Sequence, residues 1–278
     1  MVNRVRKNRF QRAREPDPIA LQPRDEIIVA LVSEFRFLAR EQLQRLLDFP
    51  CVTRINIRLR KLYDHGYLSR RFLPTVSGSP KALYVLGPRG VLIASESLNL
   101  DHRQVEKERM AVLQEKDLFL DHQTLLNETR ICLTAAINNT QQMRLERWSK
   151  DHQIRLPGQE KKLRPDGYLC FFCQGKVYGF FLEVDCSTMS SDRIKSKAAA
   201  YLDYARSGLY EEDFGLRYFR VLFVAKTEVR LLNLKSAIEE LTDRVFCLTT
   251  LDRLYGNPVR DRIWQRVARP GLFSLLED

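Results

Sequence analysis

The apolar segment 167–185, GYLCFFCQGKVYGFFLEVD, constrains the fold of this chain most strongly. Two apolar runs flank the short turn QGK, a pattern typical of a buried β-hairpin. The second run ends with Glu183 and Asp185, which are two residues apart and therefore share one face of a strand. Ionised groups are seldom buried without a positive partner. These two carboxylates therefore mark a candidate functional site. The alternative is that they pair with basic residues of the following helix and fix that helix on the sheet.

The segments around this hairpin predict an α/β (α+β) domain over residues 117–256. An amphipathic helix and the strand MRLERWS precede the hairpin, and the helix SSDRIKSKAAAYLDYARSG follows it and ends at Gly208. The strand YFRVLFVAK, the helix EVRLLNLKSAIEELTD and the strand VFCLTT complete the domain. The predicted order is helix, three strands, helix, strand, helix, strand, and residues 257–278 are expected to form a short helix and a tail.

Residues 24–98 show the pattern of an N-terminal winged helix-turn-helix. Three helices are predicted, and the third, VTRINIRLRKLYDHG, ends at the helix-stop residue Gly66. Two short strands around a turn rich in Pro, Ser and Gly follow. Residues 99–116 are densely charged, and we expect a linker or connecting helix there.

The third helix has an apolar face and a basic face at about 100° per residue. Val52, Ile55, Leu59 and Leu62 are expected to pack inward. Basic side chains on an outer face can contact phosphates or guanine, and an apolar one can contact a thymine methyl. The candidate DNA contacts of this helix are Thr53, Arg54, Ile57, Arg58, Arg60 and Lys61, and those of the hairpin are Arg70, Arg71 and Lys81. A solvated face that binds protein is the alternative.

The charge of the chain agrees with double-stranded DNA as the partner. The formal net charge is +11 over 278 residues, and such an excess favours a polyanion. The segment 1–23 lacks the apolar content to fold alone, so we expect a mobile basic arm. Its candidate phosphate contacts are Arg4, Arg6, Lys7 and Arg9.

Other features of the sequence exclude some classes of protein. No apolar run approaches the roughly 18 residues of a membrane-spanning helix, and the basic N-terminus lacks the apolar stretch of a secretory signal. We therefore expect a cytoplasmic protein without a membrane partner. Cys170 and Cys173 form a C-x-x-C pair without a second pair, which favours free core thiols over a zinc site.

The carboxylates of the second domain resemble those of the PD-(D/E)xK nuclease-like fold. Asp166 follows a proline in RPDGYL, and Glu183 and Asp185 end LEVD before a basic helix. The resemblance implies that Asp166, Glu183 and Asp185 hold Mg²⁺ and that a lysine assists catalysis. Asp185 stands where that lysine normally lies, and Lys197 or Lys195 of the following helix could replace it.

The wider pattern resembles the replication-relaxation family of plasmid and mobile-element proteins. The resemblance covers residues 24 to about 250 and includes His122, Asn127, Trp148, RPDGYL, FLEVDCST and RIKSKAAAY. Thr188, Lys197 and Tyr201 lie within or behind the Glu183-Val184-Asp185 motif. The resemblance implies a DNA-binding protein tied to plasmid replication, DNA relaxation or transfer.

Two functions remain open at this point. One is a DNA-binding protein whose nuclease-like domain is a platform for DNA or for replication or transfer proteins. The other is a Mg²⁺-dependent endonuclease in which Lys197 assists the three carboxylates. A transcriptional regulator is a weaker third hypothesis, and a homodimer on a symmetric site stays open.

Overall fold

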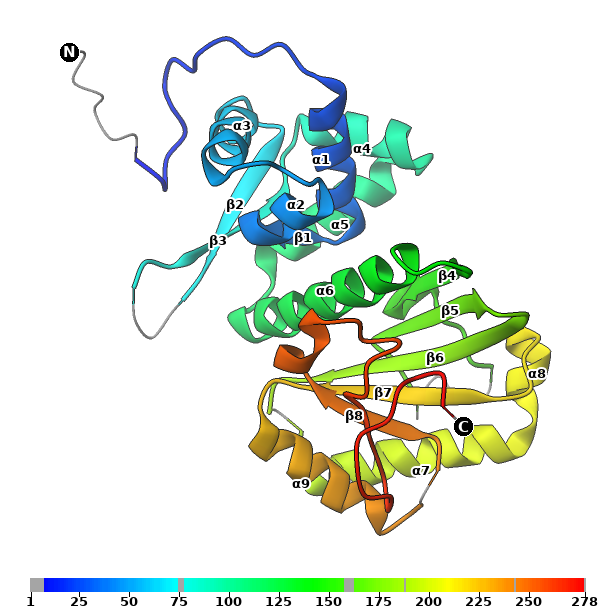
Figure 1. The fold of residues 1–278 in the computed structure, drawn as a ribbon. Coiled ribbons are helices and arrows are strands. Elements are labelled where there is room, and N and C mark those ends of the chain that lie inside the picture. The colour runs from blue at the N-terminus through cyan, green and yellow to red at the C-terminus, as the bar shows by residue number, and fades with distance from the viewer. Residues whose placement is uncertain (1–7, 75–77, 158–162, 188, 243, 278) are drawn as a thin grey trace. The chain divides into compact units, whose positions relative to one another are not determined.

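The computed structural model describes residues 8–74, 78–157, 163–187, 189–242 and 244–277 (Figure 1). The chain divides into two compact units, residues 1–127 and 128–278. We call them unit 1 and unit 2. The boundary falls within one helix, α6 (Asp117–Asn138).

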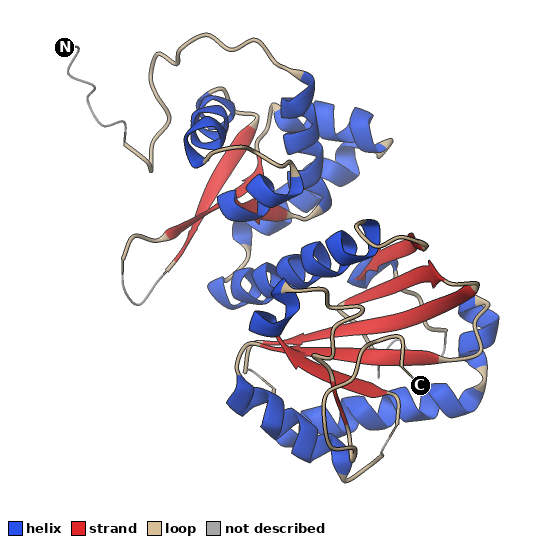
Figure 2. Cartoon of the chain, in the orientation of Figure 1, coloured by secondary structure: helices blue, strands red, loops and turns tan. Residues whose placement is uncertain are grey.

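Unit 1 combines helices with a small antiparallel sheet (Figure 2). Among its described residues the sheet has the strand order β1-β3-β2. Its elements before α6 are α1 (Pro23–Glu34), β1 (Phe37–Ala39), α2 (Arg40–Leu46), α3 (Val52–Asp64), β2 (Leu68–Leu73), β3 (Lys81–Leu86), α4 (Gly90–Leu98) and α5 (His102–Gln114). Residues 99–116, predicted to be a linker or a connecting helix, contain the helix α5, which belongs to unit 1.

The apolar stripe of α3 builds the core of unit 1 as its spacing predicts. Ile55, Leu59 and Leu62 are fully buried, because they recur on one side of the helix. Val52 differs from the expectation, since 43% of its surface is exposed at the first position of the helix. The chain leaves α3 through Gly66, whose φ of +81° suits a residue without a side chain.

The two strands β2 and β3 pair in register and have two different faces. Leu83 and Val85 of β3 lie in an apolar cluster with Val112 of α5 and Leu120 of α6. The opposite face carries Arg70 paired with Tyr84 and Phe72 paired with Ala82. Side chains alternate along a strand, so these four residues face away from that apolar cluster.

Unit 2 is a mixed sheet with helices against it (Figure 1). Within its described residues the strand order is β4-β5-β6-β7-β8-β9, with β6, β7 and β8 parallel to one another. The elements are β4 (Met143–Lys150), β5 (Gly167–Cys173), β6 (Lys176–Asp185), α7 (Ser191–Ser207), α8 (Leu209–Phe214), β7 (Phe219–Ala225), α9 (Glu228–Glu239), β8 (Phe246–Thr250) and β9 (Gln265–Arg266), with short 3₁₀ turns at Asp151–Gln153 and Leu251–Tyr255.

The core of unit 2 lies between the sheet and the helices α7 and α9. Phe181 and Phe223 face Tyr201 of α7 and Leu234 of α9 in one buried cluster. The segment after β8 lies on the other side of the sheet, where Arg220 donates to the carbonyl of Leu275 at 2.9 Å. Instead of the short helix expected over residues 257–278, the segment contains turns and the short strand β9.

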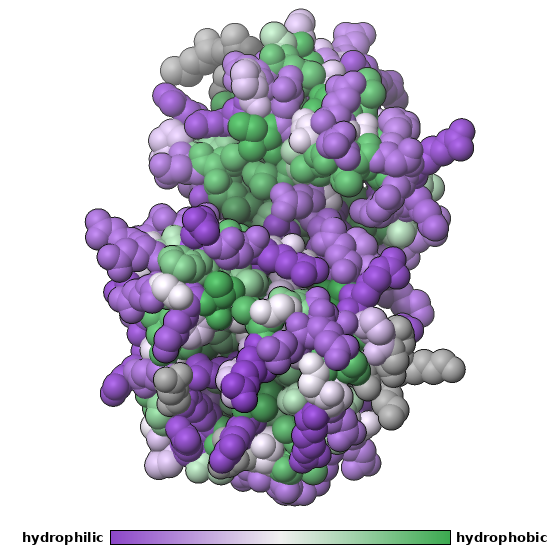
Figure 3. Space-filling view, turned by 90° about the vertical axis from the view of Figure 1, so that its right-hand side faces the viewer, coloured by the Kyte–Doolittle hydropathy of each residue, from purple (hydrophilic) through white to green (hydrophobic). Residues whose placement is uncertain are grey.

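On the face that Figure 3 shows, polar side chains cover much of each unit, with apolar patches between them. No helix in the described parts of the chain combines the length and the apolar character needed to cross a membrane.

Candidate functional site

The first half of α3 presents its side chains to solvent. Thr53, Arg54, Asn56 and Ile57 are exposed, and 56% of the surface of Ile57 is accessible. Arg54 makes no hydrogen bond or ion pair with the residues that the structure describes. Asn56 was absent from the predicted contacts, although its position on the outer face of the helical pattern would have indicated it.

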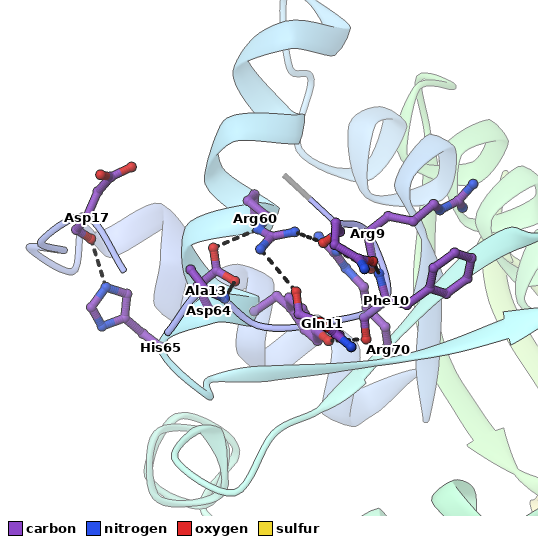
Figure 4. Close-up of polar contacts among 11 residues, drawn as sticks. Arg9, Phe10, Gln11, Ala13, Asp17, Arg60, Asp64, His65 and Arg70 are labelled. Carbon is purple, nitrogen blue, oxygen red and sulfur yellow. Dashed lines mark hydrogen bonds and ion pairs between the residues drawn. The ribbon is translucent and has the colours of Figure 1, made fainter. Parts of the chain in front are cut away.

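Residues 8–22 lie along the second half of α3 and form no helix or strand (Figure 4). We call them the arm. Arg60 donates to the backbone carbonyls of Asn8 at 2.6 Å and of Gln11 at 3.1 Å. This attachment differs from the mobile arm that the composition predicts. Arg4, Arg6 and Lys7 lie outside the described residues.

The other two basic side chains in the second half of α3 also donate hydrogen bonds to the backbone of the arm. Arg58 forms an ion pair with the buried carboxylate of Asp25 and donates to the carbonyl of Ala20 at 2.7 Å. Lys61 donates to the carbonyl of Pro18 at 3.2 Å. Arg58, Arg60 and Lys61 were predicted to be open for contact with DNA. Each of them instead donates hydrogen bonds to backbone carbonyls of the arm.

The two arginines predicted for the hairpin point to opposite faces, because they are adjacent in a strand. Arg71 donates to the carbonyls of Leu113 at 2.5 Å and Glu115 at 2.9 Å, at the end of α5. It therefore caps a helix C-terminus and is not part of the surface predicted to contact DNA. Arg70 lies on the other face, where its guanidinium is 4.1 Å from the centre of the Tyr63 ring.

Arg70, Arg9 and Lys81 lie together around one pocket of unit 1. Arg70 donates to the carbonyl of Arg9 at 3.1 Å, and Arg9 donates to the carbonyl of Pro80 at 2.6 Å. Lys81 is exposed at the start of β3. The structure thus brings predicted contacts from the arm and the hairpin together.

In unit 2, the three predicted carboxylates lie around the end of β6. Glu183 and Asp185 are each only 1% exposed. Asp166 directly precedes β5, and its Oδ2 accepts a hydrogen bond from the backbone N–H of Val184 at 2.8 Å. The hairpin register places Gly167 beside Leu182, which brings Asp166 next to the motif.

Glu183 is held by two side chains of α7. The ammonium of Lys197 donates to Oε2, and the hydroxyl of Tyr201 donates to Oε1 at 2.6 Å. Lys197 and Tyr201 are four residues apart on one face of the helix, so both reach the same strand end. Thr188 of the motif lies outside the described residues, and Lys195 instead pairs with Glu240 at 2.5 Å.

Asp185 is held by a different element. The guanidinium of Arg230, in the first turn of α9, donates to both carboxylate oxygens at 2.6 and 3.0 Å. The backbone N–H of Ser187 adds a hydrogen bond at 2.6 Å. Sequence reasoning missed Arg230, because it lies 45 residues after Asp185 in an ordinary amphipathic helix.

The burial of Glu183 dominates the electrostatics of this cluster. Burial raises the pKa of Glu183 to about 7, and the nearby Lys197 ammonium offsets only part of that effect. Burial lowers the pKa of Lys197, but the carboxylates of Glu183 and Asp166 outweigh it, so the pKa of Lys197 lies above its usual value. The carboxylates therefore keep the ammonium of Lys197 protonated beside Glu183.

The donor set around these carboxylates does not fit the Mg²⁺ ion that the nuclease-like pattern implies. Both oxygens of Glu183 accept hydrogen bonds from α7, and both oxygens of Asp185 accept from Arg230. Mg²⁺ needs open oxygen ligands in octahedral geometry. No group of three or more His, Cys, Asp or Glu side chains in the described ranges is arranged to hold a metal ion.

The chain is similar to one protein family and to two solved structures. A family model described as replication-relaxation matches residues 29–217. No curated protein matches the sequence. A structure of the restriction endonuclease FokI is similar at 13% identity and a TM-score of 0.33, over 84% of this chain and 42% of that one. A structure of FokI bound to DNA shows 15% identity and a TM-score of 0.29, over 82% and 43%. The chain spans less than half the length of these endonuclease chains.

Proposed function

This chain belongs to the replication-relaxation family, and on that premise we propose that it is a DNA-binding protein. It acts in the replication, relaxation or transfer of a plasmid or another mobile element. Unit 1 binds duplex DNA, and unit 2 is a nuclease-like platform that does not cleave it.

The exposed first half of α3 carries this proposal. The order α1, β1, α2, α3, β2, β3 supports a winged helix-turn-helix with α3 as the recognition helix. In such modules the N-terminal residues of the recognition helix contact base edges. Thr53, Arg54, Asn56 and Ile57 are exposed at that end, whereas the arm occupies the other end.

The paired carboxylates of unit 2 support binding without cleavage. Lys197 and Arg230 neutralise Glu183 and Asp185 at the positions where a nuclease of this kind would hold its metal. These ion pairs also fix α7 and α9 to the C-terminal end of β6. This arrangement supports a role for unit 2 as a platform that contacts DNA or a partner protein.

A metal-dependent endonuclease is the second candidate. The proximity of Lys197 to Glu183 and Asp166 favours it, because a carboxylate pair with a lysine is the side-chain set of that chemistry. The hydrogen bonds that occupy both carboxylate oxygens of Glu183 and of Asp185 weigh against it.

Gel retardation of random-sequence duplex DNA at two salt concentrations tests the binding proposal. Arg54→Gln is expected to weaken binding about tenfold, in keeping with the loss of one base or phosphate contact. Arg103→Gln, an exposed position on α5, is the matched control and is expected to bind as wild type. Equal affinity of the two variants, or no retardation by the wild type, would contradict the proposal.

A further inference from the structure

Unit 1 contains an open pocket of about 540 Å³ between the arm, α2, α3 and the β2–β3 hairpin. We call it the hairpin pocket. Five of its lining side chains are cationic and one is a carboxylate, Glu41. The cations are Arg9, Arg40, Arg60, Arg70 and Lys81. Such a surplus of positive charge in a concave site selects an anionic ligand.

Two of these cations have unused hydrogen-bond donors. Nε of Arg40 and Nε of Arg70 are buried and have no hydrogen-bond partner among the residues that the structure describes. A buried donor without an acceptor costs free energy, and a ligand that supplies an acceptor removes this cost. Phosphate oxygens match the guanidinium group particularly well.

The size and the walls of the pocket fit more than a phosphate group. A volume of this size is typical of sites for whole small ligands. Phe72 and Tyr84 line it, with the guanidinium of Arg9 5.1 Å from the Phe72 ring and that of Arg70 5.2 Å from the Tyr84 ring. Unstacked bases pack on aromatic rings and on guanidinium planes of this kind.

A base-paired nucleotide cannot enter a pocket, because its base lies inside the helical stack. We propose that the hairpin pocket binds one unpaired DNA nucleotide next to the duplex on unit 1. Arg40, Arg70 and Lys81 bind its phosphate, and its base lies against Phe72 and the guanidinium of Arg9, with Asn56 within the same pocket. This inference rests on the proposed function, since it assumes that unit 1 binds DNA.

The arm is part of this site. Arg9 reaches it from the arm, and the Phe10 and Phe72 rings pack with their centres 4.6 Å apart (Figure 4 shows Arg9, Phe10 and Arg70). The contacts of Arg60 with the arm hold this wall in place. The second half of α3 therefore positions the arm, and the arm completes the pocket.

Fluorescence anisotropy with two labelled probes tests the proposal. One probe is a blunt random-sequence duplex, and the other is the same duplex with a five-nucleotide single-stranded tail, made in 5′ and 3′ versions. We expect at least one tailed probe to bind the wild type about fivefold or more tightly than the blunt probe. Arg40→Gln/Lys81→Gln should remove this preference. Arg103→Gln/Lys107→Gln changes the net charge equally at exposed positions of α5 and should keep it.

Glu41→Gln tests the pocket with the opposite sign. The Glu41 carboxylate pairs with Arg40 at 2.5 Å, so its removal should strengthen binding of the tailed probe more than of the blunt one. Equal binding of blunt and tailed probes by the wild type, or a preference that survives Arg40→Gln/Lys81→Gln, overturns the inference but leaves duplex binding intact. If neither probe binds, the proposed function fails and the inference falls with it.

Discussion

The ammonium of Lys197 on α7 donates a hydrogen bond to Glu183, a carboxylate that is 99% buried at the end of β6. The same carboxylate accepts from Tyr201. A lysine thus lies beside the glutamate of the Glu183-Val184-Asp185 motif, although the residue two positions after the glutamate is Asp185. This lysine, Lys197, belongs to the helix α7 and not to the strand β6, and its ammonium contacts the carboxylate of Glu183 directly.

Replacing Lys197 by methionine should destabilise unit 2 by about 3 kcal/mol, because it leaves a buried carboxylate without its cation. The double variant Lys197→Met/Glu183→Gln should regain part of this loss, since glutamine is neutral and still accepts from Tyr201. Urea unfolding of the two variants and of the wild type gives the free energies. A double variant no more stable than Lys197→Met would show that the charge of Glu183 is not the cause.

The pKa of Glu183 predicts a dependence of stability on pH. Its folded-state pKa of about 7 lies above the ordinary value of 4.5, so the folded protein binds this proton more tightly than the unfolded chain. The resulting stabilisation is complete below pH 4.5 and is lost as the pH rises through 7. Relative to Glu183→Gln, the wild type should lose up to about 3 kcal/mol between pH 5 and pH 8.

Urea unfolding of both proteins at four pH values between 5 and 8 checks this prediction. A wild type that gains stability relative to Glu183→Gln as the pH rises would contradict it. That result would mean that Lys197 lowers the pKa of Glu183 more than burial raises it.

The attachment of the arm predicts its protection from proteases. The carboxylate of Asp64 accepts from the backbone N–H of Ala13 at 2.9 Å and from Arg60 at 2.6 Å. Asp64→Ala removes both contacts and should raise tryptic cleavage at Arg12 and Arg14 about fivefold. The reason is that the loss of one hydrogen bond to the arm increases the population of the detached arm by about this factor. Asp203→Ala, at an exposed position of unit 2, is the control. Equal cleavage of all three proteins would mean that the arm is not attached in solution.

Arg58 and Arg54, four residues apart on α3, should respond differently to substitution. Arg58→Gln leaves the fully buried Asp25 without its cation and should lower the free energy of unfolding by about 3 kcal/mol. Arg54→Gln should leave stability unchanged, because its side chain is exposed. Thermal unfolding of the two variants distinguishes them, and a stability loss at Arg54 of similar size would contradict the assignment of roles.

Local patterns in the sequence predict much of this architecture. The apolar spacing of Ile55, Leu59 and Leu62 predicts α3 and its buried face, and the run ending in Glu183 predicts β6. The family resemblance is confirmed by the match over residues 29–217. These features depend on residues close together in the chain, where periodicity is informative.

The partners of charged side chains are harder to predict, because they depend on tertiary contacts. Nothing near Arg230 in the sequence indicates Asp185, and composition alone suggests that the arm is unattached. The opposite directions of Arg70 and Arg71 do follow from strand alternation. That rule gives the directions of the two side chains only when both residues are known to belong to one strand.

Incubation of the protein with supercoiled plasmid and Mg²⁺ or Mn²⁺, with binding and cleavage scored on the same samples, distinguishes DNA binding from DNA cleavage. We expect retarded plasmid that remains supercoiled, with binding weakened by Arg54→Gln and unaffected by Glu183→Gln. Nicked or linear plasmid with the wild type, lost in both Glu183→Gln and Asp166→Ala, would contradict it. That result would mean that the contact between Lys197 and Glu183 opens to admit a metal ion.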